Sequence, residues 1–348
     1  MTALRALCML LAVAMLSACA RALPPGVTEL TYASPYAPTH PFSKADIAWI
    51  RFVETRSGGH LRIRPNWSGA LLSADMSMEE LRHGVADIGL VTPIYVRGGT
   101  QLIRVQSGFY SGATTIPAQV ALYRCIEVAS PGIAEEMHGL KVLAVQGGSL
   151  PGVVTRSRAV RSLTDLRGLR LRAPTELLGV LRQLGADPVD MPMGEVYSAM
   201  SKGMIDGVVA PADTFRSLHF AEIAAHFNTL AVPRGAYPAR AMRQATWDAL
   251  SPADRQVLTE SGAVWEAALA REIEAAWQKG YAEAVAHHIA ILPMPAADQA
   301  KFDALYLHDA EVNARGLGRL GIDGLGAFRA ARGAVKARDQ ISCGGAPS

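Results

Sequence analysis

Aromatic side chains and excess charge of either sign are scarce in this chain of 348 residues. Only 6% of its residues are Phe, Trp or Tyr, which leaves little for stacking on bases. Lys and Arg number 34 against 31 Asp and Glu, a net charge of +3, and no basic block occurs. We therefore expect no nucleic-acid partner. The chain is long enough to bury a large core, and its length suggests two domains.

Motifs that carry catalysis or hold metals are also missing. The sequence has no G-x-S-x-G, no H-E-x-x-H and no P-loop. One dinucleotide-like glycine spacing, residues 316–321, follows a helical pattern instead of a strand, where the motif has no meaning. The histidines have no Cys or His partner at metal-ligand spacing. The sequence thus predicts a protein that is not an enzyme and that uses no cofactor and no metal.

A short apolar run lies at the N-terminus: residues 6–16, directly after Arg5. This pattern predicts a secretory signal, because the run is too short to span a bilayer. The Leu-Ser-Ala-Cys that follows resembles a bacterial lipobox, which implies removal of residues 1–18 and lipidation of Cys19. Ala20, which follows Cys19, implies that the lipoprotein is sorted to the outer membrane, on its periplasmic face. The alternative is ordinary cleavage with an incidental Cys19.

Two cysteines would remain thiols in the mature chain, Cys125 and Cys343. An oxidising periplasm allows them to pair. However, Cys125 lies in a helical pattern and Cys343 in a Gly-rich tail, residues 336–348, that is expected to be flexible. We therefore expect two unpaired thiols, with a disulfide as the open alternative.

Residues 163–224 carry the clearest alternation of strands and helices. Apolar residues alternate with Arg170 and Arg172 at strand spacing, and Pro174 ends the strand. Thr175 is expected to cap the helix that follows. Further strand and helix patterns complete a β-α-β-α-β run, which implies a parallel sheet with helices on its faces.

Arg172 is the main candidate for ligand binding, because ligands of such sheets bind beyond the carboxyl ends of the strands. Its planar guanidinium could hold both oxygens of a carboxylate, with help from the Thr175 hydroxyl and the helix start. The alternative is an arginine on a sheet rim that pairs with a surface acid. Spacing alone favours this alternative, since ligand sites are few per protein.

An internal similarity suggests two lobes of like topology. Residues 81–91 read LRHGVADIGLV and residues 200–210 read MSKGMIDGVVA. In each segment a glycine suits the position after a helix, and an Asp suits the tight turn before a buried strand. Two such copies are typical of a bilobed binding protein.

The segments DLRGLRLRAP, LGADPVDMPMGEVYSAMSKGMIDGVVAP and ATWDALSPADRQVL resemble the solute-binding proteins of tripartite ATP-independent periplasmic (TRAP) transporters, the DctP-type family. The resemblance covers roughly residues 32–292. It implies an α/β bilobed periplasmic-binding-protein fold with a hinge and a long bridging helix. The expected parts are a linker at 19–28, lobe I at 29–146 and 235–265, lobe II at 147–234 and 275–335, and the long helix at 251–290.

The resemblance implies that Arg172 binds the carboxylate of a small organic acid between the lobes. The closed protein would then deliver the acid to the membrane subunits of a TRAP permease. Further candidate cleft residues lie on loops, at the sheet edge and at the hinge: Tyr36, Trp67, Ser68, Thr175, Asp213 and Tyr237.

Two positions depart from the family pattern. Where many members have a second arginine, this chain has Pro151 or a neighbour of it, so Arg156 is a candidate substitute, although a solvated basic strand is the favoured interpretation. Ala210 stands where some relatives carry Asn. A methyl group cannot hydrogen-bond a substrate, so the contact of that Asn with the substrate is absent or comes from Asp213 or Thr214. The acid itself is therefore not identified.

Two other functions remain open. The chain could be a ligand-sensing surface lipoprotein with the same fold, or, less favoured, a lipoprotein enzyme that uses the same cleft. Genes for permease subunits beside this one would favour transport. The lack of a nucleophile with a base argues against the enzyme.

Overall fold

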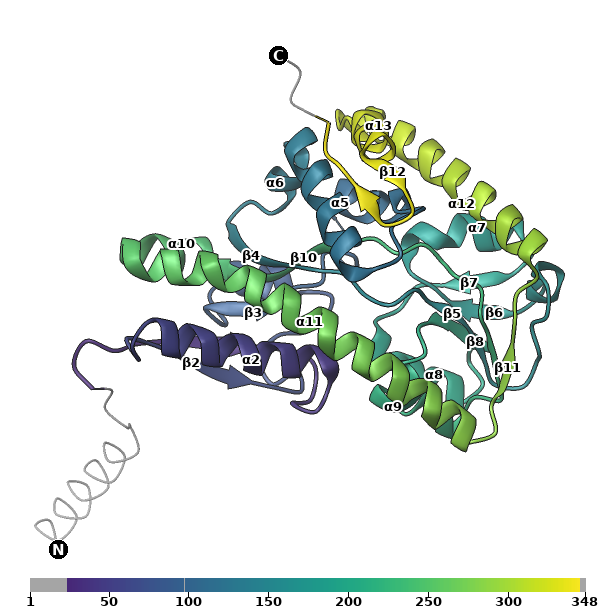
Figure 1. Ribbon diagram of the computed structural model, residues 1–348, viewed down its shortest axis with the longest axis horizontal. Coiled ribbons are helices and arrows are strands. Elements are labelled where there is room, and N and C mark those ends of the chain that lie inside the picture. Colours follow the sequence, from purple (N-terminus) through teal and green to yellow (C-terminus); the bar gives the residue numbers. More distant parts are fainter. Residues whose placement is uncertain (1–23, 97, 345–348) are drawn as a thin grey trace, which may run out of the picture.

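The computed structural model describes residues 24–96 and 98–344. Its strands form two main sheets, and each sheet is flanked by helices, so that two α/β lobes lie side by side (Figure 1). This confirms the expected bilobed architecture. The predicted signal segment, residues 1–18, and the predicted lipidation site, Cys19, lie outside the described residues.

Lobe I is built on a five-stranded sheet in the order β2-β1-β3-β10-β4. Its strands are β1 (Thr28–Ala33), β2 (Leu61–Asn66), β3 (Ile88–Leu90), β4 (Leu140–Gln146) and β10 (Tyr237–Arg243). Its helices are α2 (Pro41–Arg56), α3 (Ser77–Arg82), α4 (Gln101–Gln106), α5 (Ile116–Ala129), α6 (Gly132–Glu136) and α10 (Gln244–Ala249). β10 runs antiparallel between β3 and β4, and it returns the chain to lobe I after the passage through lobe II.

Lobe II contains a six-stranded sheet in the order β11-β9-β5-β8-β6-β7. Its strands are β5 (Gly152–Thr155), β6 (Arg170–Arg172), β7 (Asp187–Val189), β8 (Gly207–Ala210), β9 (His226–Asn228) and β11 (Ala290–Leu292). Its helices are α7 (Leu178–Gln183), α8 (Val196–Ser201) and α9 (Thr214–Ser217). β6 pairs in parallel with β7 and β8, as the β-α-β-α-β pattern predicts.

The two lobes share a structural repeat that the sequence indicated. Gly84 and Gly203 follow helices with φ of +81° and +69°, a region that favours glycine. Asp87 Oδ2 then accepts the backbone N–H of Thr31 at 2.8 Å, and Asp206 Oδ2 accepts that of Arg170 at 2.7 Å. In both lobes, an Asp before one strand therefore anchors the neighbouring parallel strand.

A 35-residue helix, α11 (Pro252–Ala286), runs along both lobes (Figure 1). It begins where the Ser251 hydroxyl accepts the backbone N–H of Asp254 at 3.1 Å. Two glycines let it approach backbone closely: a Cβ on Gly262 would overlap the Leu143 carbonyl of β4, and a Cβ on Gly280 would overlap a carbonyl of lobe II. The helix is thus packed tightly on each lobe.

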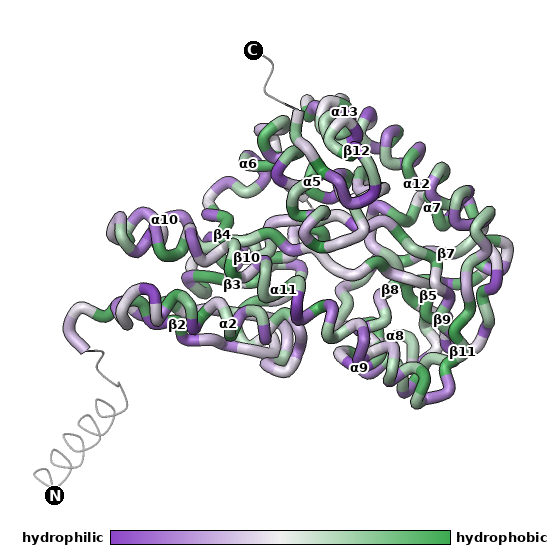
Figure 2. The backbone as a smooth tube through the Cα atoms, in the orientation of Figure 1, coloured by the Kyte–Doolittle hydropathy of each residue, from purple (hydrophilic) through white to green (hydrophobic). Residues whose placement is uncertain are grey.

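The C-terminal helices differ from the expected division into lobes. α12 (Ala296–Gly316) begins against lobe II, where Phe302 and Tyr306 join its core, and its second half packs into the core of lobe I through Ala310 and Ala314. α13 (Gly324–Ala334) packs on α5. The assignment of residues 275–335 to lobe II is therefore wrong for the second half of α12 and for α13, because their apolar side chains join the same core cluster as α5. Along α12, hydrophobic and hydrophilic residues alternate (Figure 2).

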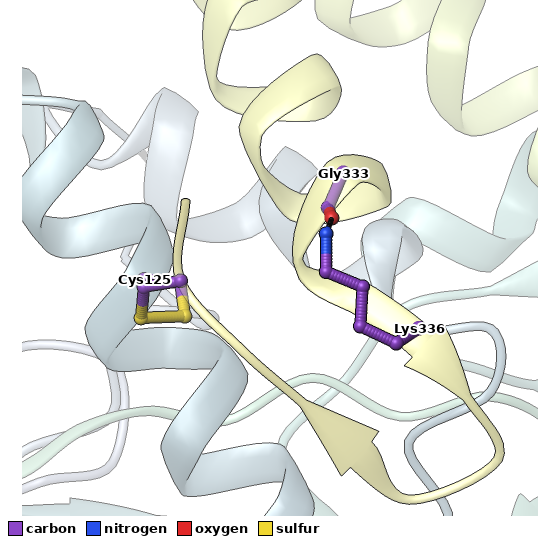
Figure 3. Close-up of a disulfide and its surroundings, with 4 residues drawn as sticks. Cys125, Gly333 and Lys336 are labelled. Atoms are coloured by element: carbon purple, nitrogen blue, oxygen red, sulfur yellow. Dashed lines mark hydrogen bonds between the residues drawn. A yellow bond between two sulfur atoms is a disulfide. The ribbon is translucent and has the colours of Figure 1, made fainter. Parts of the chain in front are cut away.

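The tail is also more ordered than expected. A hairpin of β12 (Val335–Ala337) and β13 (Gln340–Ile341) follows α13, and Cys343 then forms a disulfide with Cys125 on α5 (Figure 3). The Asp339 carboxylate accepts hydrogen bonds from Thr114 and Thr115. The predictions of two free thiols and of a flexible tail through residue 343 are wrong, since the fold brings the tail against α5.

Candidate functional site

A cavity of about 110 Å³ lies between the lobes. Lobe I contributes Tyr36 and Tyr95, lobe II contributes Arg172, and α11 contributes Ile273. A larger space of about 1250 Å³ lies beside it between the lobes and α11, and it is lined partly by the same residues. Side chains of both lobes therefore surround the inner cavity.

Arg172 is the most unusual lining residue, because its charged side chain is only 2% exposed. It sits on β6, where Nε donates to the carbonyl of Met191 at 2.9 Å and Nη2 donates to the hydroxyl of Tyr95 at 3.1 Å. No carboxylate among the described residues lies within 4.0 Å of the guanidinium. A buried charge without a counterion costs several kcal/mol, so the site is suited to an anion.

Tyr95 belongs to lobe I, on the loop that follows β3, and Arg172 belongs to lobe II. The Arg172 guanidinium lies 5.8 Å from the centre of the Tyr95 ring, in addition to its hydrogen bond with the hydroxyl. Their contact thus joins the lobes across the cavity. The sequence analysis did not select Tyr95, although its place beyond the carboxyl end of a strand was a signal that could have found it.

Arg234 is a second cation in the cavity, and the sequence analysis missed it altogether. It lies on the segment between β9 and β10, which returns the chain from lobe II to lobe I. Its guanidinium packs on Gly148, on the segment between β4 and β5. The tertiary fold therefore supplies an arginine at the hinge, whereas the expected substitute, Arg156, lies elsewhere.

Two carboxyl groups share the cavity with these arginines. Burial raises the pKa of Glu176 to about 7, with Asp190 adding to the effect and Arg172 and Arg234 opposing it. Burial likewise raises the pKa of Asp213 to about 6, and Arg234 opposes that rise. Near neutral pH, the protonation of both groups therefore depends on what occupies the cavity.

Tyr237 connects the cavity to the core of lobe I. Its hydroxyl accepts a hydrogen bond from Gln146 Nε2 at 2.7 Å, and burial raises its pKa to about 12. Gln146 Oε1 also accepts a hydrogen bond from Arg240 Nη1 at 3.4 Å. Arg240 Nε in turn forms an ion pair with Asp46 Oδ1 at 2.7 Å. The phenol is thus held in one orientation by a buried polar network.

Tyr36 and His40 form the wall of the cavity in lobe I. Their rings are stacked with centres 4.1 Å apart, and both line the inner cavity. Burial lowers the pKa of His40 to about 3, so the ring is neutral. Tyr36, Asp213 and Tyr237 are therefore predicted site residues that the structure brings together with Arg172.

Thr175 and Arg156 are placed differently from what the sequence predicts. Thr175 does not cap a helix: it lies in a short 3₁₀ turn, and its hydroxyl donates to Asp190 at 2.6 Å. It does not line the cavity, because that hydrogen bond directs it to the neighbouring strand end. Arg156 is exposed and lies beside Gly203, also away from the cavity.

Three other predicted residues also lie outside the inner cavity. Ala210 is buried in the core of lobe II, because alternation along β8 places Val209 on the cavity side instead. Trp67 packs edge-on against Tyr32 in lobe I, with ring centres 5.7 Å apart. Ser68 lines only the larger space between the lobes.

Other kinds of site are not found in the described part of the chain. Residues 24–96 and 98–344 contain no group of three or more His, Cys, Asp or Glu side chains placed to hold a metal ion. None of the helices in these ranges has the length and apolar character that a membrane span requires.

Two α/β lobes, a shared helix and a buried arginine between the lobes define a bilobed ligand-binding protein. The model of bacterial extracellular solute-binding proteins, family 7 (DctP), matches residues 32–308. The chain belongs to this family, which confirms the resemblance found in the sequence.

Among curated relatives, a solute-binding protein of Albidiferax ferrireducens is 25% identical over 222 residues, 62% of this chain and 64% of that protein. The 2,3-diketo-L-gulonate-binding periplasmic protein of Escherichia coli is 30% identical over 130 residues, 36% of this chain and 39% of that protein. The chain thus spans less than two thirds of the length of each of these relatives.

Solved structures match over nearly their whole length. A TRAP solute-binding protein from Rhodoferax ferrireducens, in complex with copurified benzoate, has a TM-score of 0.80 at 24% identity and covers 88% of this chain and 97% of its own. One from Bordetella bronchiseptica, with bound (R)- and (S)-mandelate, has a TM-score of 0.78 at 23% identity and covers 89% and 99%. At these identities, the matches establish the bilobed fold.

Proposed function

We propose that this chain is the solute-binding protein of a TRAP-type transporter, which captures a small organic acid between its lobes and delivers it to membrane permease subunits. The observation that carries this proposal is Arg172, a guanidinium 2% exposed that has no carboxylate partner among the described residues. The relatives solved with benzoate and mandelate bind acids of this class.

The ligand carboxylate would use the side of Arg172 that the protein leaves open. Nε and Nη2 already donate to the protein, whereas Nη1 has no hydrogen-bond partner among the described residues. A carboxylate there would give the guanidinium the negative partner it lacks. Since Tyr95 reaches Arg172 from the opposite lobe, an acid bound at this point would favour the closed arrangement of the lobes.

The place of action in this proposal is the periplasm. Residues 1–18 would be the signal, and Cys19 would carry a lipid that holds the protein at the outer membrane, with residues 19–28 as the tether. The Cys125–Cys343 disulfide supports export, because such bonds persist in oxidising compartments. Mass spectrometry of the mature N-terminus tests this, and an unmodified Cys19 would contradict the anchor.

A thermal-shift screen tests the function. Monocarboxylates, dicarboxylates, keto acids and aromatic acids are added to the purified protein. A true ligand stabilises the folded state by mass action, by about 2.7 kcal/mol of unfolding free energy at one hundred times its Kd, and so raises the melting temperature. Arg172→Gln should lose the shift. Arg156→Gln removes the same charge at an exposed position and should keep it.

The screen has clear contrary outcomes. If no acid raises the melting temperature, or if Arg172→Gln responds as the native protein does, the proposed function is wrong. Recovery of a chemically altered acid after incubation would instead favour the enzyme.

A further inference from the structure

Arg234 occupies a position where two chain segments that join the lobes touch. It follows β9, and its guanidinium lies against Gly148, which follows β4, so closely that a Cβ on Gly148 would overlap Nη1 and Cζ. The neighbouring Gly235 packs equally closely on Ser107 of lobe I. The absence of a side chain at Gly148 leaves room for the Arg234 guanidinium, and the absence of one at Gly235 lets the next residue of the segment lie against lobe I.

Gly148 itself is firmly held. Its backbone N–H donates to Gln119 Oε1 at 2.8 Å, and its carbonyl accepts from Gln119 Nε2 at 3.0 Å. Gln119 is buried on α5. The surface under the Arg234 guanidinium is therefore rigid, which limits the directions in which this side chain can point.

The guanidinium of Arg234 has no carboxylate within 4.0 Å among the described residues, although it lines the cavity. It acts on the same groups as Arg172, since burial raises the pKa of Glu176 and that of Tyr36 and both cations oppose these rises. Residues 24–96 and 98–344 thus place no carboxylate within 4.0 Å of either cavity arginine, and one of these arginines belongs to the hinge.

The acidic groups stand apart from the arginines. Asp213 is 7% exposed, and among the described residues its only hydrogen-bond partner from another side chain is the Ser217 hydroxyl at 3.5 Å, a long contact. Glu176 Oε2 has no hydrogen-bond partner in the described part of the chain. Besides these charged groups, apolar side chains line the cavity: Ile94, Leu177, Val209, Val232 and Ile273.

We propose that Arg234 is the second cation for the ligand's carboxylate beside Arg172, and that the ligand is a monocarboxylate with a hydroxyl group, which donates to Asp213. This inference rests on the proposed function and deepens it. The apolar wall and the volume of about 110 Å³ suit a compact ring or branched carbon skeleton. A dicarboxylate is disfavoured, because its second charge would face Asp213 and Glu176.

Titration calorimetry on two series of acids tests this. The aromatic series is benzoate, 3-hydroxybenzoate and isophthalate, and the aliphatic series is 3-methylbutanoate, its 2-hydroxy derivative and methylsuccinate. In the series that binds, the hydroxy acid should bind most tightly and the diacid most weakly. Arg234→Gln should weaken binding about tenfold, as expected for a lost charge-assisted hydrogen bond.

Three further variants separate the contributions. Gly148→Ala should also weaken binding, although Gly148 only supports Arg234, because the new methyl group would displace the guanidinium. Arg156→Gln removes one exposed positive charge and should bind as the native protein does. Asp213→Ala should abolish the preference for the hydroxy acid and leave the affinity for the unsubstituted acid no weaker.

The possible failures are distinct. If Arg234→Gln and Gly148→Ala, shown to be folded by circular dichroism, bind like Arg156→Gln while Arg172→Gln does not bind, the role of Arg234 is wrong and the proposed function stands. If a diacid binds more tightly than the hydroxy acid, or if only acids outside both series bind, the ligand class is wrong. Loss of binding in every protein, native included, would overturn the proposed function as well.

Discussion

The Arg172 guanidinium is buried, and its Nη1 has no hydrogen-bond partner among the described residues. The planar geometry of the side chain therefore matters for ligand binding as much as its charge does. Lys carries the same charge but is a point donor, which cannot keep the hydrogen bonds to Met191 and Tyr95 while binding a carboxylate through two atoms. Arg172→Lys should therefore weaken ligand binding at least tenfold, measured by calorimetry. Native affinity in this variant would show that charge alone suffices.

Glu176 and Asp213 make acid binding depend on pH. Their raised pKa values, about 7 and about 6, mean that both lose charge as the pH falls from 8 to 5.5. Asp190, Arg172 and Arg234 act on Glu176, and Arg234 acts on Asp213. Loss of the two negative charges therefore makes the cavity more positive. An acid that stays ionised in this range should bind more tightly at pH 5.5 than at pH 8.

The unliganded protein should show the matching change in stability. A carboxyl group whose pKa is raised by folding stabilises the fold fully below its unfolded pKa, and this contribution is lost as the pH rises through the folded value. Glu176→Gln with Asp213→Asn should flatten the dependence of both binding and unfolding between pH 5.5 and 8. A native profile that is flat from the outset would contradict the raised pKa values.

At the scale of elements, α11 depends on close backbone contact with both lobes. Gly280→Ala should destabilise the protein by about 1–3 kcal/mol, because the added methyl group meets the carbonyl of Ala212, which cannot turn away as a side chain would. Gly333→Ala, in α13 with nothing within 4 Å of the added Cβ, is the matched control. It should be neutral or stabilising by up to about 1 kcal/mol.

Denaturant unfolding measures both variants. Equal stability of Gly280→Ala and Gly333→Ala would mean that α11 is not closely packed on lobe II. A selective loss in Gly280→Ala that is accompanied by weaker ligand binding would link the helix contact to the geometry of the cavity.

At the scale of the whole molecule, the Cys125–Cys343 disulfide closes a loop that spans 218 positions of the sequence. It ties the end of the chain to lobe I after α12 has crossed from lobe II. Replacing both cysteines by Ser should lower the free energy of unfolding by about 2–4 kcal/mol. Reduction of the native protein should have the same effect, and an unchanged denaturation midpoint in both cases would contradict this role.

The sequence by itself determined what depends on neighbours along the chain. The spacing of apolar residues predicts the strands and helices of residues 163–224 and the helix around Cys125, because helix and strand periods are local properties. The glycines and aspartates of the repeat predict tight turns for the same reason. Arg172 could be placed at the sheet edge because it ends a strand.

Only the tertiary structure decided which distant segments meet. The docking of α13 on α5 and the pairing of Cys125 with Cys343 join parts of the chain about two hundred residues apart. Arg234 enters the cavity because Gly148 leaves room for it, while Thr175 turns to Asp190. These outcomes depend on the shape and packing of the assembled lobes, and no period or spacing along the sequence records that shape.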